Sequence, residues 1–158
     1  MGDIAPDFVL DGVDGATGEG HRYRLSDLRG APVVLVFYPG DNTPVCRQQL
    51  LSYTEEIGQF ARLGAKVLAL SPQSVESHRD FAERTGGFAF PLLADDNKEV
   101  ARSYGNLGLL DLYRRSTVVL DADGVVRYTH RYFGPGLAFK PVEDLVDILS
   151  GLDSSAVG

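Results

Sequence analysis

The sequence predicts an α/β domain with a central mixed β-sheet flanked by helices and an N-terminal β-hairpin extension. Three short apolar runs, at residues 33–38, 66–70 and 117–120, are bounded by turn residues and are too short for buried helices. They therefore predict buried strands. Helical spacing between the first two runs makes those strands parallel. A short Gly-ended turn after the third run predicts an antiparallel neighbour, so the sheet is mixed.

The first third of the chain predicts a small hairpin, a central strand and a long helix. Residues 8–10 and 23–25 form the hairpin around a glycine-rich loop over 12–20. After the strand at 33–38, a helix is predicted from about Pro44 to Leu63. Its buried face is indicated by apolar residues that recur at steps of three and four: Leu50, Tyr53, Ile57 and Phe60.

The middle of the chain predicts two further helices. Ser74 is a good N-cap for a helix that runs to about Arg84, and a shorter helix is predicted over 97–104. His78 shares the spacing of Val75 and Phe81 on the first of these helices. We therefore interpret His78 as a structural residue on a half-buried helix face, and not as a catalytic one.

The C-terminal part predicts a hairpin and a last helix. The turn at 121–124 joins the third apolar run to a strand over 125–131. Pro141 suits the first turn of a helix whose buried stripe includes Leu145 and Leu149, and Gly151 is expected to end it. We expect a single domain over residues 1–153 and a disordered tail over 154–158.

Composition excludes several classes of function. The formal charge of −7 and a pI near 4.8 argue against nucleic acid as a partner, because phosphate binding needs clustered Lys and Arg. We find no leader pattern and no apolar segment of membrane-spanning length, so we expect a cytoplasmic protein with no membrane partner. The single cysteine, Cys46, rules out an internal disulfide and the Cys-x-x-Cys zinc patterns. We expect no cofactor and no metal.

The surroundings of Cys46 predict an activated thiol. Thr43 is a good N-cap residue and Pro44 suits the first helical position, so Cys46 falls third in the helix. The first turn has unpaired backbone N–H groups and the positive end of the helix dipole, and both stabilise a thiolate. A free cysteine is also a common buried hydrophobe, so position alone leaves both interpretations open.

The pattern Pro39-x-x-x-Thr43-x-x-Cys46, within FYPGDNTPVC, resembles the active-site signature of the peroxiredoxins. It is most similar to the branch of bacterioferritin comigratory protein and peroxiredoxin Q. The segments APDFVL, LSDLRGAPVVLVFYP and RRSTVVLDADGVV extend the resemblance over nearly the whole chain. The resemblance implies a thioredoxin-like fold and a thiol-dependent peroxidase that reduces hydrogen peroxide and organic hydroperoxides through a sulfenic acid.

The same resemblance implies roles for individual residues. Cys46 matches the peroxidatic cysteine, Thr43 the hydroxyl that contacts the sulfur and the peroxide, and Pro39 the shield over the site. The backbone N–H groups of Val45 and Cys46, which lie in the first turn of the predicted helix, are expected as further contacts to the peroxide oxygens. Arg115 stands where the family has its active-site arginine.

Arg114 is the competing candidate for this arginine. Successive residues of a strand face opposite ways, so only one of the two can reach Cys46, and we favour Arg115.

The chain departs from this branch at three places. Leu51 occupies the position of the resolving cysteine, which implies a one-cysteine scheme. Gln49 replaces a usual glutamate that pairs with the arginine, so Arg115 is expected to be less firmly oriented. The leucine-rich segment 107–112 is either an apolar entrance for organic hydroperoxides or a loop packed on the core, and we favour the packed loop.

The one-cysteine scheme implies an external thiol as partner, which is thioredoxin, glutaredoxin or a low-molecular-weight thiol. The resemblance leaves open whether the protein is a monomer or a homodimer. Two other functions fit the same fold: a non-enzymatic redox sensor and a thiol–disulfide oxidoreductase. The second needs a partner thiol that this sequence lacks.

Acidity alone cannot make a thiol a fast peroxidase. A thiol whose pKa falls from about 8.5 to about 6 gains roughly thirtyfold in thiolate at neutral pH. The same drop costs it roughly tenfold in nucleophilicity, since the Brønsted slope is about 0.4 to 0.5. The rest of the rate must come from donors that stabilise the transition state.

Overall fold

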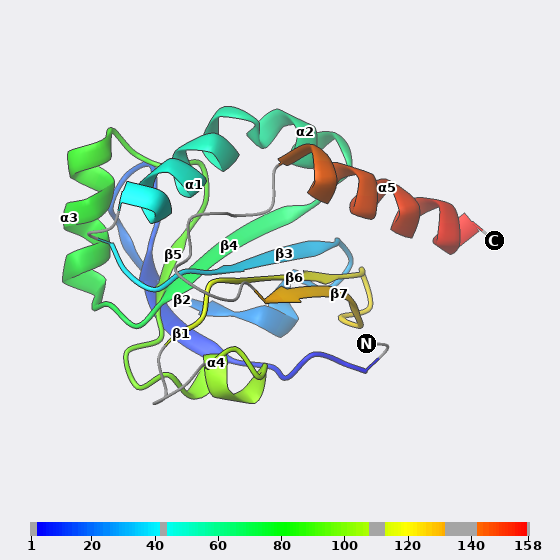
Figure 1. Cartoon of the computed structure of the whole chain (residues 1–158), viewed down its shortest axis with the longest axis horizontal. Helices are drawn as coiled ribbons and strands as arrows, with labels where there is room; N and C mark the ends of the chain where they lie inside the picture. The colour runs from blue at the N-terminus through cyan, green and yellow to red at the C-terminus, as the bar shows by residue number, and fades with distance from the viewer. Residues whose placement is uncertain (1–2, 42–43, 108–112, 132–141, 158) are drawn as a thin grey trace.

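The computed structural model of the chain describes residues 3–41, 44–107, 113–131 and 142–157. Within these ranges, seven strands form one sheet in the order β2-β1-β5-β4-β3-β6-β7 (Figure 1). Their bounds are β1 Val9–Val13, β2 Gly20–Arg24, β3 Val33–Phe37, β4 Lys66–Ser71, β5 Leu92–Ala94, β6 Ser116–Leu120 and β7 Val126–Arg131.

The pairing around β3 confirms the predicted mixed sheet. β3 runs parallel to β4 and antiparallel to β6, and β6 forms an antiparallel hairpin with β7. All five residues of β3 are buried, as are all five of β6, which fits continuous apolar runs at the centre of a sheet.

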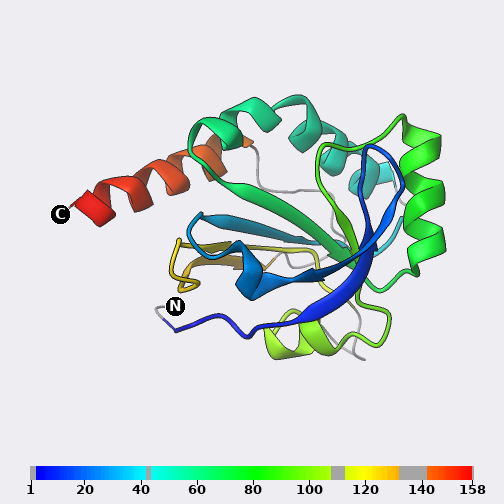
Figure 2. The same ribbon diagram turned by 180° about the vertical axis from the view of Figure 1, so that it is seen from behind.

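Helices cover both faces of the sheet, and each face has its own core (Figures 1 and 2). The first core lies under the helices α1 Pro44–Glu55, α2 Ile57–Arg62, α3 Val75–Thr85 and α5 Val142–Val157. The second core lies under the short helix α4 Glu99–Ser103, the 3₁₀ turn η1 Leu25–Leu28 and the residues before β1. Alternate residues of β3 and β6 point into the two cores.

Two helix predictions concern α3 and the helix after β3. Ser74 caps α3 as predicted, because its side chain accepts a hydrogen bond from the Ser77 N–H at 3.1 Å. The long helix predicted from Pro44 to Leu63 is instead two helices, interrupted at Glu56, whose φ and ψ are −102° and 16°. There the N–H of Gln59 donates to the carbonyl of Glu56 in a tighter turn.

The predicted end of the last helix is wrong. α5 continues through Gly151 to Val157, so the helix includes residues 154–157, where a disordered tail was expected. Glycine lowers helix stability by about 1 kcal/mol relative to alanine, and it ends a helix only when a left-handed conformation follows. Gly151 is not among the glycines with positive φ.

The N-terminal hairpin exists, but its strands extend into the segment predicted as a glycine-rich loop. β1 reaches Val13 and β2 begins at Gly20. Gly12 is required there, because a Cβ on it would lie 2.5 Å from the carbonyl oxygen of Leu92 in β5. This close approach attaches the hairpin to the main sheet through β5, a strand of three residues that the sequence pattern did not reveal.

No helix among the described residues combines the length and the apolar character needed to cross a bilayer.

Candidate active site around Cys46

Cys46 lies in the first turn of α1, directly after the segment that leaves the carboxyl end of β3. The helix begins at Pro44, which makes Cys46 its third residue, as predicted. The cysteine is fully buried in the first core. Carboxyl ends of parallel strands are where α/β folds build their sites, and β3, β4 and β5 all end at this edge of the sheet.

Arg115 reaches Cys46 from the position immediately before β6. The antiparallel register pairs Phe37 with Ser116, so Arg115 stands beside the end of β3 and points to the same face as Thr117. Its Nη2 donates to the Cys46 Sγ at 3.1 Å. The structure thus brings Arg115 to the sulfur, as favoured over Arg114, whose backbone N–H donates to the Asn106 carbonyl.

Gln49 holds the other branch of the same guanidinium. Its Oε1 accepts a hydrogen bond from Arg115 Nη1 at 2.5 Å, and its Nε2 donates to the Tyr53 hydroxyl at 3.4 Å. Gln49 lies one helical turn after Cys46 and is fully buried. The amide therefore orients Arg115, although it brings no charge.

The charge of Arg115 makes the sulfur a place where negative charge is stabilised. A guanidinium is always protonated, and only 5% of Arg115 is exposed. None of the ion pairs among the described residues includes Arg115. A buried charge is costly without a partner, and the Cys46 sulfur is the atom beside Arg115 on which a negative charge would offset that cost.

Arg115 also has a hydrogen-bond donor that the described residues do not use. Its Nε is buried and has no hydrogen-bond partner among the described residues. A buried donor without a partner loses the hydrogen bond that it would make in water. The site can therefore supply one further hydrogen bond to a small oxygen-containing molecule.

Of the remaining predicted site residues, the structure describes Pro39 but neither Thr43 nor the side chain of Val45. Pro39 is exposed, two residues beyond the end of β3. Thr43 lies outside the described residues, as do the side chain of Val45 and positions 108–112 of the leucine-rich segment. The roles assigned to Thr43, Pro39 and Val45 therefore stay predictions.

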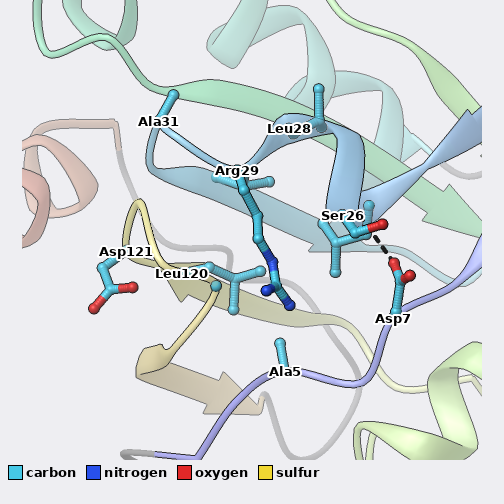
Figure 3. A pocket seen from close by; sticks show the side chains of 11 residues that line it. Ala5, Asp7, Ser26, Leu28, Arg29, Ala31, Leu120 and Asp121 are labelled. Atoms are coloured by element: carbon cyan, nitrogen blue, oxygen red, sulfur yellow. Dashed lines mark hydrogen bonds between the residues drawn. The ribbon is translucent and has the colours of Figure 1, made fainter.

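A small hollow lies away from Cys46, next to the amino end of β3 (Figure 3). Arg29 points into it, and Asp7 accepts a hydrogen bond from the N–H of Ser26 at 2.9 Å at its rim. The space offers only about 10 Å³ to the centre of a water molecule, roughly the room that one ordered water needs. This hollow is too small for a substrate site.

Comparison with known proteins places this geometry in context. The sequence pattern of the AhpC/TSA family matches residues 1–129. A peroxiredoxin of Thermoplasma volcanium is 35% identical over 161 residues, which span 96% of this chain and 74% of that protein. The chloroplastic peroxiredoxin Q of Sedum lineare is 35% identical over 155 residues, spanning 97% and 77% of the two chains.

Solved structures agree with the fold. The crystal structure of Enterococcus faecalis AhpC superposes with a TM-score of 0.89 at 26% identity, covering 99% of this chain and 93% of that one. The reduced 2-Cys peroxiredoxin of Plasmodium vivax gives a TM-score of 0.89 at 22% identity, covering 100% and 99%. The thioredoxin-like fold implied by the sequence resemblance is confirmed.

Proposed function

The chain belongs to the AhpC/TSA family and is a thiol-dependent peroxidase, and from this membership we propose that Cys46 is the residue that attacks the peroxide. The observation that carries the proposal is the hydrogen bond of 3.1 Å from Arg115 to the Cys46 sulfur. It joins a fixed positive charge to the one thiol of the chain.

The proposed first step is a displacement on oxygen. The Cys46 thiolate attacks one peroxide oxygen, an S–O bond forms, and the O–O bond breaks. The departing oxygen takes up a proton and leaves as water or as an alcohol, and Cys46 becomes a sulfenic acid. Negative charge moves from the sulfur to the departing oxygen during this step. The guanidinium of Arg115 can stabilise the charge at both atoms.

Further donors complete the proposed site. In this proposal the Thr43 hydroxyl and the N–H groups of Val45 and Cys46 contact the two peroxide oxygens, and Pro39 shields them, as the family resemblance implies for Thr43 and Pro39. The free Nε of Arg115 supports this arrangement, because it offers one more donor to an oxygen close to the sulfur. Hydrogen peroxide and organic hydroperoxides share the group that these donors would bind.

The proposed second half of the cycle uses thiols from outside the chain. A first thiol attacks the sulfenic sulfur and releases water, which leaves a mixed disulfide on Cys46. A second thiol attacks the mixed disulfide and restores the Cys46 thiolate. Thioredoxin, glutaredoxin and low-molecular-weight thiols are the candidate reductants, and such thiols fit a cytoplasmic location. Leu51, where the branch often has its resolving cysteine, cannot supply this thiol.

Sustained turnover distinguishes this proposal from a redox sensor. We expect hydrogen peroxide to be consumed continuously while thiol is supplied, in many equivalents per protein. Cys46→Ser should abolish all of this consumption. The measurement is peroxide loss with thioredoxin, glutaredoxin and glutathione in turn. Consumption that stops after one equivalent with every thiol contradicts an enzyme and favours the sensor.

A further inference from the structure

A buried polar network joins the end of β3 to helix α3. Tyr38 donates its hydroxyl to Asp41 Oδ1 at 2.7 Å, and Ser77 donates its hydroxyl to Asp41 Oδ2 at 2.7 Å. His78 places Nδ1 at 2.8 Å from Asp41 Oδ2 and Nε2 at 3.0 Å from the carbonyl oxygen of Leu93. The side chains of Asp41 and His78 are both fully buried.

The hydrogen bonds of His78 fix its protons. A carbonyl oxygen can only accept, so Nε2 carries a hydrogen toward Leu93. The other ring nitrogen, Nδ1, lies within hydrogen-bond distance of Asp41 Oδ2, at 2.8 Å. His78 therefore connects Asp41 to β5 through two directed bonds. Removing the Asp41 side chain would leave a buried nitrogen of His78 without its hydrogen bond, and removing His78 would take a hydrogen bond from a buried oxygen of Asp41.

The network fixes the position of Asp41, which lies shortly before α1, the helix that carries Cys46. Asp41 stands five residues before Cys46, and its own N–H donates to Gln73 Oε1 at 3.4 Å. The segment is thus tied to α3 and to the loop before it through both a side chain and the backbone. Tyr38 and Cys46 lie in the same core.

The surroundings of Tyr38 also change the pKa of its phenol. The pKa of Tyr38 lies well above its ordinary value, chiefly because the phenol is buried. The negative charges of Asp41 and Cys46 and the hydrogen bond to Asp41 raise it further. Tyr38 therefore stays protonated and keeps donating to Asp41, and its phenol lies within electrostatic reach of the sulfur.

We propose that Asp41 and His78 are positioning residues of the peroxidase, whose buried pair fixes the start of α1 and thereby the place of Cys46 opposite Arg115. This inference rests on the proposed role of Cys46. Displacement of a reacting group by about 1 Å can cost roughly a hundredfold in rate. The pair touches neither sulfur nor peroxide; it acts by tying Asp41, five residues before Cys46, to α3 and β5.

The test is a double-mutant cycle between Asp41→Ala and Arg115→Ala. We expect Asp41→Ala alone to slow the reaction of Cys46 with hydrogen peroxide by about tenfold, since the sulfur moves relative to Arg115. In the Arg115→Ala background the same change should cost less than about twofold, because the contact that it disturbs is already absent. Asp41→Asn, which keeps most of the hydrogen bonds, should recover most of the rate.

A milder pair of variants keeps the test valid if Asp41→Ala does not fold. Tyr38→Phe and Tyr104→Phe each remove a phenol hydroxyl that donates to an oxygen at 2.7 Å, and Tyr104 lies in the opposite core. We expect only Tyr38→Phe to slow peroxide reduction, by more than about twofold, and to lose that effect in the Arg115→Ala background.

Two results overturn the inference alone: a folded Asp41→Ala protein that reacts as fast as the parent, or equal losses in the two arginine backgrounds. The second result would mean that the network only stabilises the fold. Failure of the parent protein to react with peroxide would instead overturn the proposed function, and the inference with it.

Discussion

Arg115→Ala should slow the reaction of Cys46 with hydrogen peroxide by about a hundredfold to a thousandfold, the usual cost of losing one fixed donor at a developing negative charge. The guanidinium donates to the sulfur at 3.1 Å, and its Nε has no hydrogen-bond partner in the part of the chain that the structure describes. The guanidinium can therefore stabilise the negative charge both on the sulfur and on the departing oxygen. A more ionised thiol gains little by itself, because its nucleophilicity falls as well.

The same variant should change the fraction of Cys46 that is thiolate far less than it changes the rate. Ultraviolet absorbance of the thiolate against pH measures that fraction, and stopped-flow mixing with peroxide measures the rate. Arg114→Ala is the matched control, since adjacent residues of an extended segment direct their side chains to opposite faces, and it should alter the rate by less than about twofold. Equal losses of rate and of thiolate would contradict transition-state stabilisation by Arg115.

Excess peroxide in the absence of thiol should inactivate the protein completely. The chain has one cysteine, so no second thiol can capture the sulfenic acid as an internal disulfide. A further peroxide then oxidises the sulfenic acid to a sulfinic acid, which thiols do not reduce. Intact mass should show the gain of two oxygen atoms, in step with the loss of peroxidase activity.

The control for this prediction is the same peroxide treatment with thiol present, which should preserve activity. Cys46→Ser reports any oxygen taken up by Met1, the other sulfur-containing residue. Activity that survives excess peroxide without thiol would mean that the sulfenic acid is protected in some other way, against the one-cysteine scheme.

Long apolar patterns predicted most of the fold. The three central strands and α3 with its Ser74 cap stand where the pattern placed them, because each buries a continuous or helically spaced apolar face. β5 was missed, since three residues are too few to show a period. The break at Glu56 was missed because the apolar spacing continues across it into α2.

Local rules also predicted the site where one element decides the geometry. Pro44 placed Cys46 in the first helical turn, and strand alternation allowed only one of Arg114 and Arg115 to reach it. The family resemblance already put Gln49 at the position that faces the arginine, but it led us to expect a less firmly oriented Arg115, and the direct bond across 66 positions was seen only in the fold. The spacing of His78 correctly indicated burial, but its pairing with Asp41 across 37 positions had no local signal.

Intact mass after one equivalent of hydrogen peroxide tests most directly whether Cys46 is the peroxidatic cysteine. We expect the protein to gain one oxygen atom on Cys46 at once, and added thiol should remove it through a mixed disulfide. Cys46→Ser should gain none. An unchanged mass, or an oxygen found on Met1 while Cys46 stays reduced, would contradict the account.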